Sequence, residues 1–405
     1  MTEYKETFIE GGTVTSPRGF KAGAVTAGIK KNRTKPDLGI LCSEKPCTAA
    51  GMFTTSKIRA AAVIVSEENL KEGRASVIVV NSGCANAYNG EKGIIDAKEM
   101  ISLAAAHTGI PESNVLVAST GVTGQLLPMD RIREGIKKIP LSADGGHDLA
   151  RAIMTTDTVP KETAVTGRNG TAAYTIGGIA KGSGMIHPNM ATMFCFLTTD
   201  APVETGFLKA ALKKAVDMSF NMISVDGDMS PSDTVVIMAN GAAGGETIQA
   251  GSRAAREFRR KLNAVCIRLA AALARDGEGA TKLIISNVTG ARNLKEARKV
   301  ARAVVMSSLI KTAVHGGDPN WGRIVAAVAQ SGIDVGLSDI DMAIGTVAVL
   351  KAGRPLPFDE KDVIGVLRQA DVPVSIHLNM GNGSATAWGC DMSEEYVGIN
   401  SEYMT

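Results

Sequence analysis

The stretch Gly178-Ile-Ala-Lys-Gly-Ser-Gly-Met-Ile-His-Pro-Asn-Met-Ala-Thr-Met193 stands near the middle of the 405-residue chain. It is rich in glycine and other small residues, and the apolar run at 193–197 that follows its Pro188 ends in Thr198-Thr-Asp200. Glycine and proline mark turns, whereas a short apolar run closed by polar residues is typical of a buried strand. We therefore predict a loop that opens into a strand at Thr192, the best candidate boundary in a chain without a long linker.

Outward from this stretch, strand and helix patterns alternate. Short apolar segments predict strands at 76–80, 115–119, 283–287, 342–350 and 373–378. Helical spacing predicts one helix around Phe207, Leu208, Ala211, Leu212 and Ala215, and a longer one around Phe258, Leu262, Val265, Cys266, Leu269 and Leu273 that ends before Gly277. We expect an α/β or α+β fold with layers of helix over sheet.

Charge and composition exclude several classes of protein. The 44 basic and 41 acidic residues give a net charge of +3, and aromatic residues make up 4%, so nothing indicates nucleic-acid binding. The first residues lack the pattern of a signal peptide, and no apolar stretch approaches the roughly 18 residues that cross a membrane. The six cysteines are scattered without a Cys-x-x-Cys pair, which is typical of reduced thiols, mostly buried, in a cytoplasmic protein.

Thr192 becomes a candidate nucleophile if the bond between Ala191 and Thr192 breaks. Scission by an N-to-O acyl shift would leave Thr192 with a free α-amino group beside its own hydroxyl. Such an amine has an ordinary pKa of about 7.7–8.0, so it can act as a general base near neutral pH. From the spacing alone, a plain strand start is nevertheless the better interpretation of this pair.

The stretch 178–193 closely resembles the processing site of the ornithine acetyltransferase family, the glutamate N-acetyltransferases of arginine biosynthesis. Other blocks resemble the same family in the same order along nearly the whole chain. They are Asn81-Ser-Gly-Cys-Ala-Asn-Ala87, Ser119-Thr-Gly-Val-Thr-Gly124, Ile153-Met-Thr-Thr-Asp-Thr158, Asn221-Met-Ile-Ser-Val-Asp-Gly-Asp228, Asp318-Pro-Asn-Trp-Gly-Arg-Ile324, Ala385-Thr-Ala-Trp-Gly-Cys-Asp391 and Tyr396-Val-Gly-Ile-Asn400. Blocks in a fixed order are far more specific than one motif, so the resemblance favours self-processing over a plain strand start.

The resemblance implies a precursor that cuts itself into an α chain (1–191) and a β chain (192–405), both kept in one folded unit. The implied fold is layered α/β, like that of the DmpA-type aminopeptidases, and similar to the N-terminal nucleophile hydrolases but distinct in topology. The implied reaction is ping-pong: Thr192 takes the acetyl group of N2-acetyl-L-ornithine and passes it to L-glutamate. No cofactor is implied, and it stays open whether acetyl-CoA is a further donor. The family's assemblies indicate two or more αβ units, as in a heterotetramer.

The resemblance also implies roles for single residues. Thr120 and Gly121 match the family's oxyanion-hole pair, where a hydroxyl and a backbone N–H suit a developing negative charge. Lys181 matches a lysine that binds a substrate carboxylate; its Lys-Gly order differs from the Gly-Lys-Ser/Thr of a phosphate-binding loop. Thr155 matches a substrate contact, although Thr156 and Thr158 lie close enough to leave that choice open.

Three further positions match substrate contacts towards the C-terminal end. Glu278 suits the ammonium group of ornithine, although a solvated loop position is the commoner fate of a glutamate. Asn400 and Thr405 match the family's C-terminal contacts, which would require the end of the chain to fold into the site.

Several tempting residues are set aside. Asp226-x-Asp228 lacks the glycine and glutamate of a calcium loop, and His315 and His377 have no partner at metal-ligand spacing, so no metal is predicted. His187 is better interpreted as a loop residue and Cys195 as a core residue. The segment Met229-Ser-Pro-Ser232 departs from the family's Thr- and Asn-rich pattern, which puts only local loop geometry in doubt.

Two other functions compete with acetyl transfer. One is a self-processed amidase or aminopeptidase of related fold, in which water resolves the acyl-enzyme. The other is a non-catalytic structural protein, which the intact Ala191-Thr192 pair speaks against.

Overall fold

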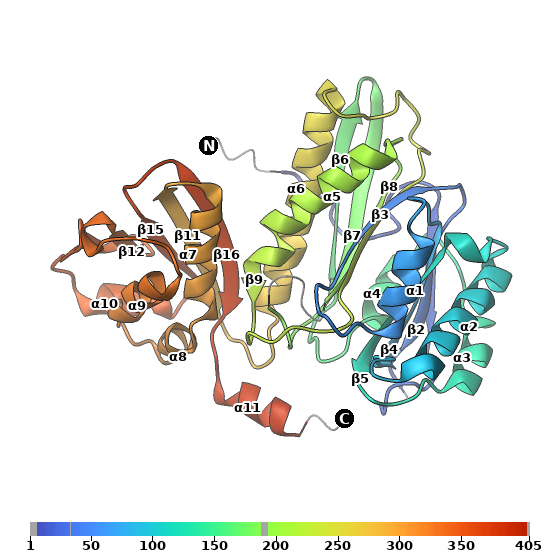
Figure 1. Cartoon of the computed structure of the whole chain (residues 1–405), viewed down its shortest axis with the longest axis horizontal. Coiled ribbons are helices and arrows are strands. Elements are labelled where there is room, and N and C mark those ends of the chain that lie inside the picture. Colours follow the sequence, from blue (N-terminus) through green and yellow to red (C-terminus); the bar gives the residue numbers. More distant parts are fainter. Residues whose placement is uncertain (1–5, 33, 188–192, 403–405) are drawn as a thin grey trace.

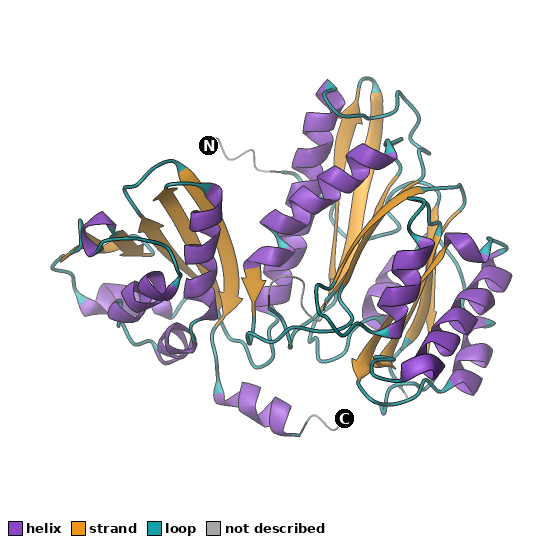
Figure 2. Cartoon of the chain, viewed as in Figure 1, coloured by secondary structure: helices purple, strands orange, loops and turns teal. Residues whose placement is uncertain are grey.

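The computed structural model describes residues 6–32, 34–187 and 193–402 (Figure 1). These residues form three β-sheets with helices between and outside them, so the predicted α/β fold is confirmed (Figure 2). In order through the molecule come helices α1–α3, a four-stranded sheet, a five-stranded sheet, helices α5 and α6, and a seven-stranded sheet with its own helices (Figure 1).

The four-stranded sheet has the order β1-β2-β4-β5, with β4 and β5 parallel and the other pairs antiparallel. Its strands are β1 (Phe20–Val25), β2 (Leu38–Ser43), β4 (Val77–Cys84) and β5 (Val115–Val122). Alternate side chains such as Val77 and Val79 face the helices α1 (Ala61–Asn69), α2 (Gly90–Thr108) and α3 (Met129–Ile136). The intervening Ile78 and Val80 face the second sheet.

The five-stranded sheet has the order β3-β10-β8-β7-β6 and thus interleaves segments from both sides of position 192. Its strands are β3 (Thr48–Phe53), β10 (Thr234–Ala239), β8 (Phe194–Thr199), β7 (Ala172–Lys181) and β6 (Lys161–Asn169). Phe194 and Phe196 pack towards the first sheet together with the short helix α4 (Gly146–Ala152), whereas Cys195 and Leu197 face the opposite side. Cys195 is fully buried in that core, as predicted.

Helices α5 (Thr205–Met218) and α6 (Arg253–Arg275) cover the second face of this sheet. Each begins at a side chain that accepts otherwise unpaired backbone N–H groups: Glu204 caps α5 and Ser252 caps α6. Both helices bury the predicted apolar stripes, including Phe207 and Phe258. All six cysteines are free and buried, in agreement with the prediction of reduced thiols.

The seven-stranded sheet has the order β14-β13-β12-β15-β11-β16-β9. Its strands are β9 (Ile223–Ser224), β11 (Leu283–Ala291), β12 (Asp341–Ile344), β13 (Val347–Lys351), β14 (Arg354–Pro355), β15 (Asp371–His377) and β16 (Gly383–Cys390). Helices α7 (Leu294–Met306), α8 (Ser308–Gly316), α9 (Gly322–Gln330) and α10 (Glu360–Leu367) accompany it. Short 3-10 turns occur at Glu112–Asn114, Phe220–Met222 and Leu337–Asp339. A last helix, α11 (Glu394–Ser401), follows β16 and lies at the bottom of the view, apart from the three sheets (Figure 1).

One predicted strand is wrong. The segment 342–350 forms two antiparallel strands, β12 and β13, instead of one. The turn between them is made by Gly345 at φ +60°, a left-handed conformation that apolar periodicity does not reveal. The other predicted strands and both helices are present, with ends that differ from the predicted ones by a few residues. Within the described ranges, no helix is both long and apolar enough to cross a membrane.

Candidate active site

Six of the predicted site residues line one cavity of about 440 Å³, a volume suited to a small metabolite. They come from five separate places in the chain: Thr120 and Gly121, Thr155, Lys181, Glu278 and Asn400. Hydroxyl groups dominate the remaining wall, which includes Thr123, Thr156, Ser230, Ser232 and Ser401. Ala191, Thr192 and Thr405 lie outside the described residues, so the structure does not test their predicted roles.

Lys181 lies at the meeting point of the first two sheets. It is the last residue of β7, not part of a glycine loop as its sequence context suggested, and its side chain is 2% exposed. Within the described residues its ammonium makes one hydrogen bond, to Thr120 Oγ1 at 3.4 Å. Burial lowers the pKa of Lys181, and nearby carboxylates, Asp157 foremost, oppose that effect. A buried ammonium with N–H groups to spare is suited to an anionic ligand.

Thr120 and Gly121 lie near the end of β5, paired with Ser82 and Gly83 of β4. Gly121 has a φ of +125°, and a Cβ there would lie 2.4 Å from the backbone carbon of Gly83. A side chain at this position is therefore excluded, and the peptide stays open to the cavity. Because Lys181 donates to Thr120 Oγ1, the Thr120 hydroxyl keeps its own hydrogen for another acceptor.

Glu278 also lines the cavity and is buried, not solvated. Its Oε2 accepts a hydrogen bond from Asn400 Nδ2 at 2.9 Å, and its backbone N–H donates to the Ser183 carbonyl at 2.8 Å. A Cβ at Gly184 would lie 2.3 Å from that same carboxylate oxygen, so the glycine makes room for it. The structure thus joins α11 and the loop after α6 at one carboxylate.

The three candidate threonines divide into two groups. Thr155 and Thr156 line the cavity, and Thr156 Oγ1 lies 2.6 Å from Ser183 Oγ. Thr158 instead bonds to Asp276 through its backbone N–H and its hydroxyl, and it is not part of the cavity wall. The choice narrows to Thr155 and Thr156.

Asp233 is a candidate residue that sequence reasoning missed. It is fully buried directly before β10, and its Oδ1 accepts the backbone N–H of Met193 at 3.0 Å. Burial raises the pKa of Asp233 well above its usual range. The parallel register of β10 with β8 brings it there, and that register is not readable from the sequence.

The segment 229–232, which departs from the family's sequence pattern, affects more than local loop geometry. Ser230, Pro231 and Ser232 form part of the cavity wall, and Ser232 is buried. This segment therefore touches whatever the cavity holds.

Among the residues set aside, Asp226, His315 and His377 have hydrogen-bond partners. The Asp226 carboxylate accepts backbone N–H groups from Met185, Ile186 and Asp228, which shapes the loop. His315 Nδ1 lies 2.8 Å from Asp391 Oδ2, and His377 Nδ1 lies 2.9 Å from Thr289 Oγ1. Across the part of the chain that the structure describes, no group of three or more His, Cys, Asp or Glu side chains could hold a metal ion.

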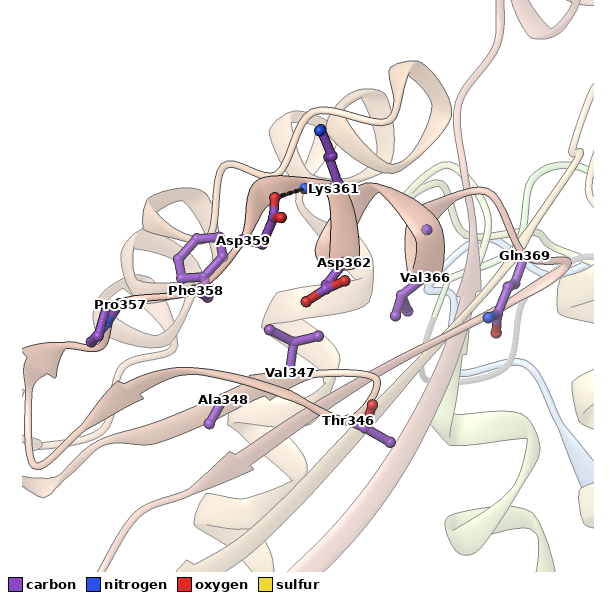
Figure 3. Close-up of a pocket in the computed structure, with 11 residues that line it drawn as sticks. Thr346, Val347, Ala348, Pro357, Phe358, Asp359, Lys361, Asp362, Val366 and Gln369 are labelled. Atoms are coloured by element: carbon purple, nitrogen blue, oxygen red, sulfur yellow. Dashed lines mark hydrogen bonds between the residues drawn. The ribbon is translucent and has the colours of Figure 1, made fainter.

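Two larger hollows contain none of the predicted site residues. One, of about 710 Å³, lies between α10 and β13, and its lining includes Phe358, Val347 and Asp362 (Figure 3). The other, of about 630 Å³, lies between the tip of the β6–β7 hairpin and the start of α6. Chemistry, and not size, distinguishes the smaller cavity as the candidate active site.

Known proteins match this chain along nearly its whole length. A family model described as the ArgJ family matches residues 21–405. The arginine biosynthesis bifunctional protein ArgJ of Dehalococcoides mccartyi is 51% identical over 395 residues, 97% of this chain and 98% of the relative. The protein of the same name from Symbiobacterium thermophilum is 50% identical over 397 residues, 97% of this chain and 99% of the relative.

A solved structure is also similar. The crystal structure of the arginine biosynthesis bifunctional protein argJ from Bacillus halodurans is 46% identical with a TM-score of 0.50. The match covers 51% of this chain and 97% of that chain.

Proposed function

The chain belongs to the ArgJ family, and on that premise we propose that it is an acetyltransferase of arginine biosynthesis. It moves the acetyl group of N2-acetyl-L-ornithine to L-glutamate through an acetyl ester on Thr192. The observation that carries this proposal is the single cavity in which Thr120, Lys181 and Glu278 meet. The amidase alternative is not favoured, because relatives named for arginine biosynthesis match 97% of the chain.

The precursor first breaks the bond between Ala191 and Thr192. Thr192 Oγ attacks the Ala191 carbonyl carbon, the C–N bond breaks, and water hydrolyses the resulting ester. The products are a new carboxylate on Ala191 and a free α-amine on Thr192, so the α chain is 1–191 and the β chain 192–405. One solved relative supports this division, because 97% of its chain matches only about half of this one (51%), as one of two polypeptides would.

In the first half-reaction, Thr192 Oγ attacks the acetyl carbonyl of acetylornithine while the Thr192 amine takes the hydroxyl proton. The tetrahedral oxyanion is stabilised by the Thr120 hydroxyl and the Gly121 N–H. When the amide C–N bond breaks, the proton passes to the departing nitrogen and ornithine leaves. In the second half-reaction the glutamate amine attacks the ester, and the proton it loses returns to Thr192 Oγ.

Two charged groups that line the cavity orient the substrate. The Lys181 ammonium binds a carboxylate, which donor and acceptor both carry, and Glu278 binds the ammonium group of ornithine. Thr155, Asn400 and Thr405 complete the contacts. The cavity supports this division because Lys181 and Glu278 are the two charged residues among those that line it in the described chain.

Three finer features complete the proposal. The relatives' name includes the word bifunctional, and we assign the second activity to acetyl-CoA as an alternative donor to glutamate. We expect the αβ units to assemble as a heterotetramer. The setting of an amino-acid biosynthetic enzyme is the cytoplasm, and no membrane, nucleic acid or metal takes part.

Replacing Thr192 tests the proposal directly. Mass spectrometry of denatured wild-type protein should show two polypeptides, the second beginning at Thr192. Thr192→Ala should give one intact chain and no acetyl transfer from acetylornithine to glutamate, whereas Thr171→Ala, in the exposed β6–β7 turn, should behave as wild type. A Thr192→Ala protein that still transfers acetyl groups would refute the assignment, and parallel assays with acetyl-CoA test the second donor.

A further inference from the structure

A chain of buried ion pairs lies directly beneath the candidate cavity. The Lys161 ammonium, at the start of β6, lies 2.6 Å from Asp157 Oδ1 and 2.5 Å from Asp276 Oδ2. The side chains of Lys161, Asp157 and Asp276 are 1%, 0% and 8% exposed. Charges this deeply buried are costly unless they are paired, so their arrangement is tightly constrained.

Asp157 ties two walls of the cavity to this chain of charges. Its Oδ1 accepts the backbone N–H of Gly182 at 2.7 Å, directly next to Lys181, and its Oδ2 accepts the backbone N–H of Thr155 at 2.9 Å. Neither oxygen reaches the cavity, since Asp157 is not among the lining residues.

Asp276, at the other end of these ion pairs, lies close in the chain to Glu278 of the cavity wall. Asp276 is the residue that ends α6, two positions before Glu278, and it also accepts the Thr158 backbone N–H at 3.0 Å. The segments that carry Thr155, Lys181 and Glu278 are therefore connected through Asp157, Lys161 and Asp276.

We propose that Asp157, held by Lys161, is a positioning residue that keeps Lys181 charged and fixed at the bottom of the cavity. The inference rests on the proposed function only in that Lys181 binds substrate. The effect of Asp157 on the charge of Lys181 does not depend on that function. Asp157 acts through Lys181 and through the Gly182 and Thr155 peptides, and it does not touch the substrate.

Electrostatics supports this role. Burial would itself raise the pKa of Asp157, but the Lys181 and Lys161 ammoniums and the hydrogen bond from Gly182 hold it at about 2, so Asp157 is a permanent anion. Burial lowers the pKa of Lys181, Asp157 raises it and Lys161 lowers it. Among the described residues, the other titratable groups that act electrostatically on Lys181 are Asp233, Glu278 and Lys30.

The two partners should therefore act on Lys181 with opposite signs. Asp157→Asn keeps the shape and an acceptor for Gly182, but it removes the anion, so the pKa of Lys181 should fall by at least about one pH unit. Lys161→Met removes a like charge and should raise that pKa. If Asp157 and Lys161 served only to pack the core, neither substitution would shift the pKa of Lys181.

Competitive labelling with trace acetic anhydride measures the ionisation of Lys181 without relying on activity. The fraction of acetylated Lys181 peptide, followed by mass spectrometry from pH 6 to 11, gives the pKa in wild type and in each variant. The alkaline limb of kcat/KM for acetylornithine should move in the same directions. Asp371→Asn, which removes the exposed ion pair with Arg275 beside the network, is the matched control and should leave the titration unchanged.

Each outcome decides the question. Opposite shifts in labelling support the proposal even if wild-type protein shows no acetyl transfer, a result that would sink the proposed function instead. Equal or absent shifts in folded variants overturn it. If Asp157→Asn does not fold, Lys161→Met alone decides: a raised pKa supports the proposal, and an unchanged or lowered one overturns it.

Discussion

The floor and the rim of the candidate cavity are built in opposite ways. The floor, defined as Lys181 of the cavity wall with Asp157 and Lys161 behind it, is buried, and an ion pair joins Lys161 to Asp157. The rim, defined as helix α11, has no buried residue and is held by side-chain contacts. Ser393 donates to the Gly279 carbonyl, Asn400 donates to Glu278, Glu394 contacts His315, and Tyr396 contacts Asp226. The floor shares the stability of the whole core, whereas the rim can open at little cost.

This difference separates two kinds of function. A group fixed in the core can be placed accurately against a reacting carbonyl, which transition-state stabilisation requires. A weakly attached helix can admit and release two different amino acids in turn. We therefore expect the loss of the Thr120 hydroxyl, which is buried and contacts Lys181 of the floor, to lower kcat, and changes in the rim to raise KM.

The largest effect is expected on kcat at Thr120, which accepts a hydrogen bond from Lys181 of the floor. Thr120→Val keeps the shape of the side chain but removes the hydroxyl that we propose stabilises the oxyanion, so kcat should fall about 10²–10³-fold with little change in KM. Steady-state kinetics at saturating acetylornithine and glutamate measures this. A kcat within threefold of wild type would remove Thr120 from the chemistry.

An intermediate effect is expected at Glu278, which accepts a hydrogen bond from Asn400 of the rim. Glu278→Gln keeps the volume but loses the charge that we propose binds the ornithine ammonium, so KM for acetylornithine should rise about 10–100-fold. Self-cleavage should remain intact in mass spectrometry. If cleavage and turnover are lost to the same degree, Glu278 supports folding instead of binding.

The smallest effect should come from the rim itself. Asn400→Ala loses one hydrogen bond to a buried carboxylate, so KM should rise about five- to tenfold while kcat stays near wild type. Val397→Ala, on the same helix and exposed, is the matched control and should change neither value. A loss of kcat larger than tenfold would place the rim within the chemistry and erase the contrast.

Local pattern predicted most of the fold. The continuous apolar run around Phe194 and Cys195 predicts a buried strand because successive side chains enter two different cores. The break at Gly345 was missed because both flanking segments are apolar and the turn depends on one backbone angle.

The site was predicted in part, through resemblance to a family instead of through physics. Lys181 and Glu278 were identified, but their burial was not, because it arises from sheets and helices that meet far apart in sequence. Asp157 and Asp233 were missed as functional candidates because what marks them is a hydrogen bond from a distant part of the chain. Asp157 accepts the backbone N–H of Gly182, and Asp233 accepts that of Met193. No local spacing encodes such a neighbour.

The interleaved order of the five-stranded sheet has a consequence for reversibility. On the proposed cleavage, β8 and β10 of one fragment lie between β3 and β7 of the other, so neither fragment can complete this sheet alone. The precursor would fold in a first-order process, but the mature protein, once denatured, would have to reassemble from two molecules. Its recovery would then depend on concentration, and a stability measured on the cleaved protein would be kinetic in origin.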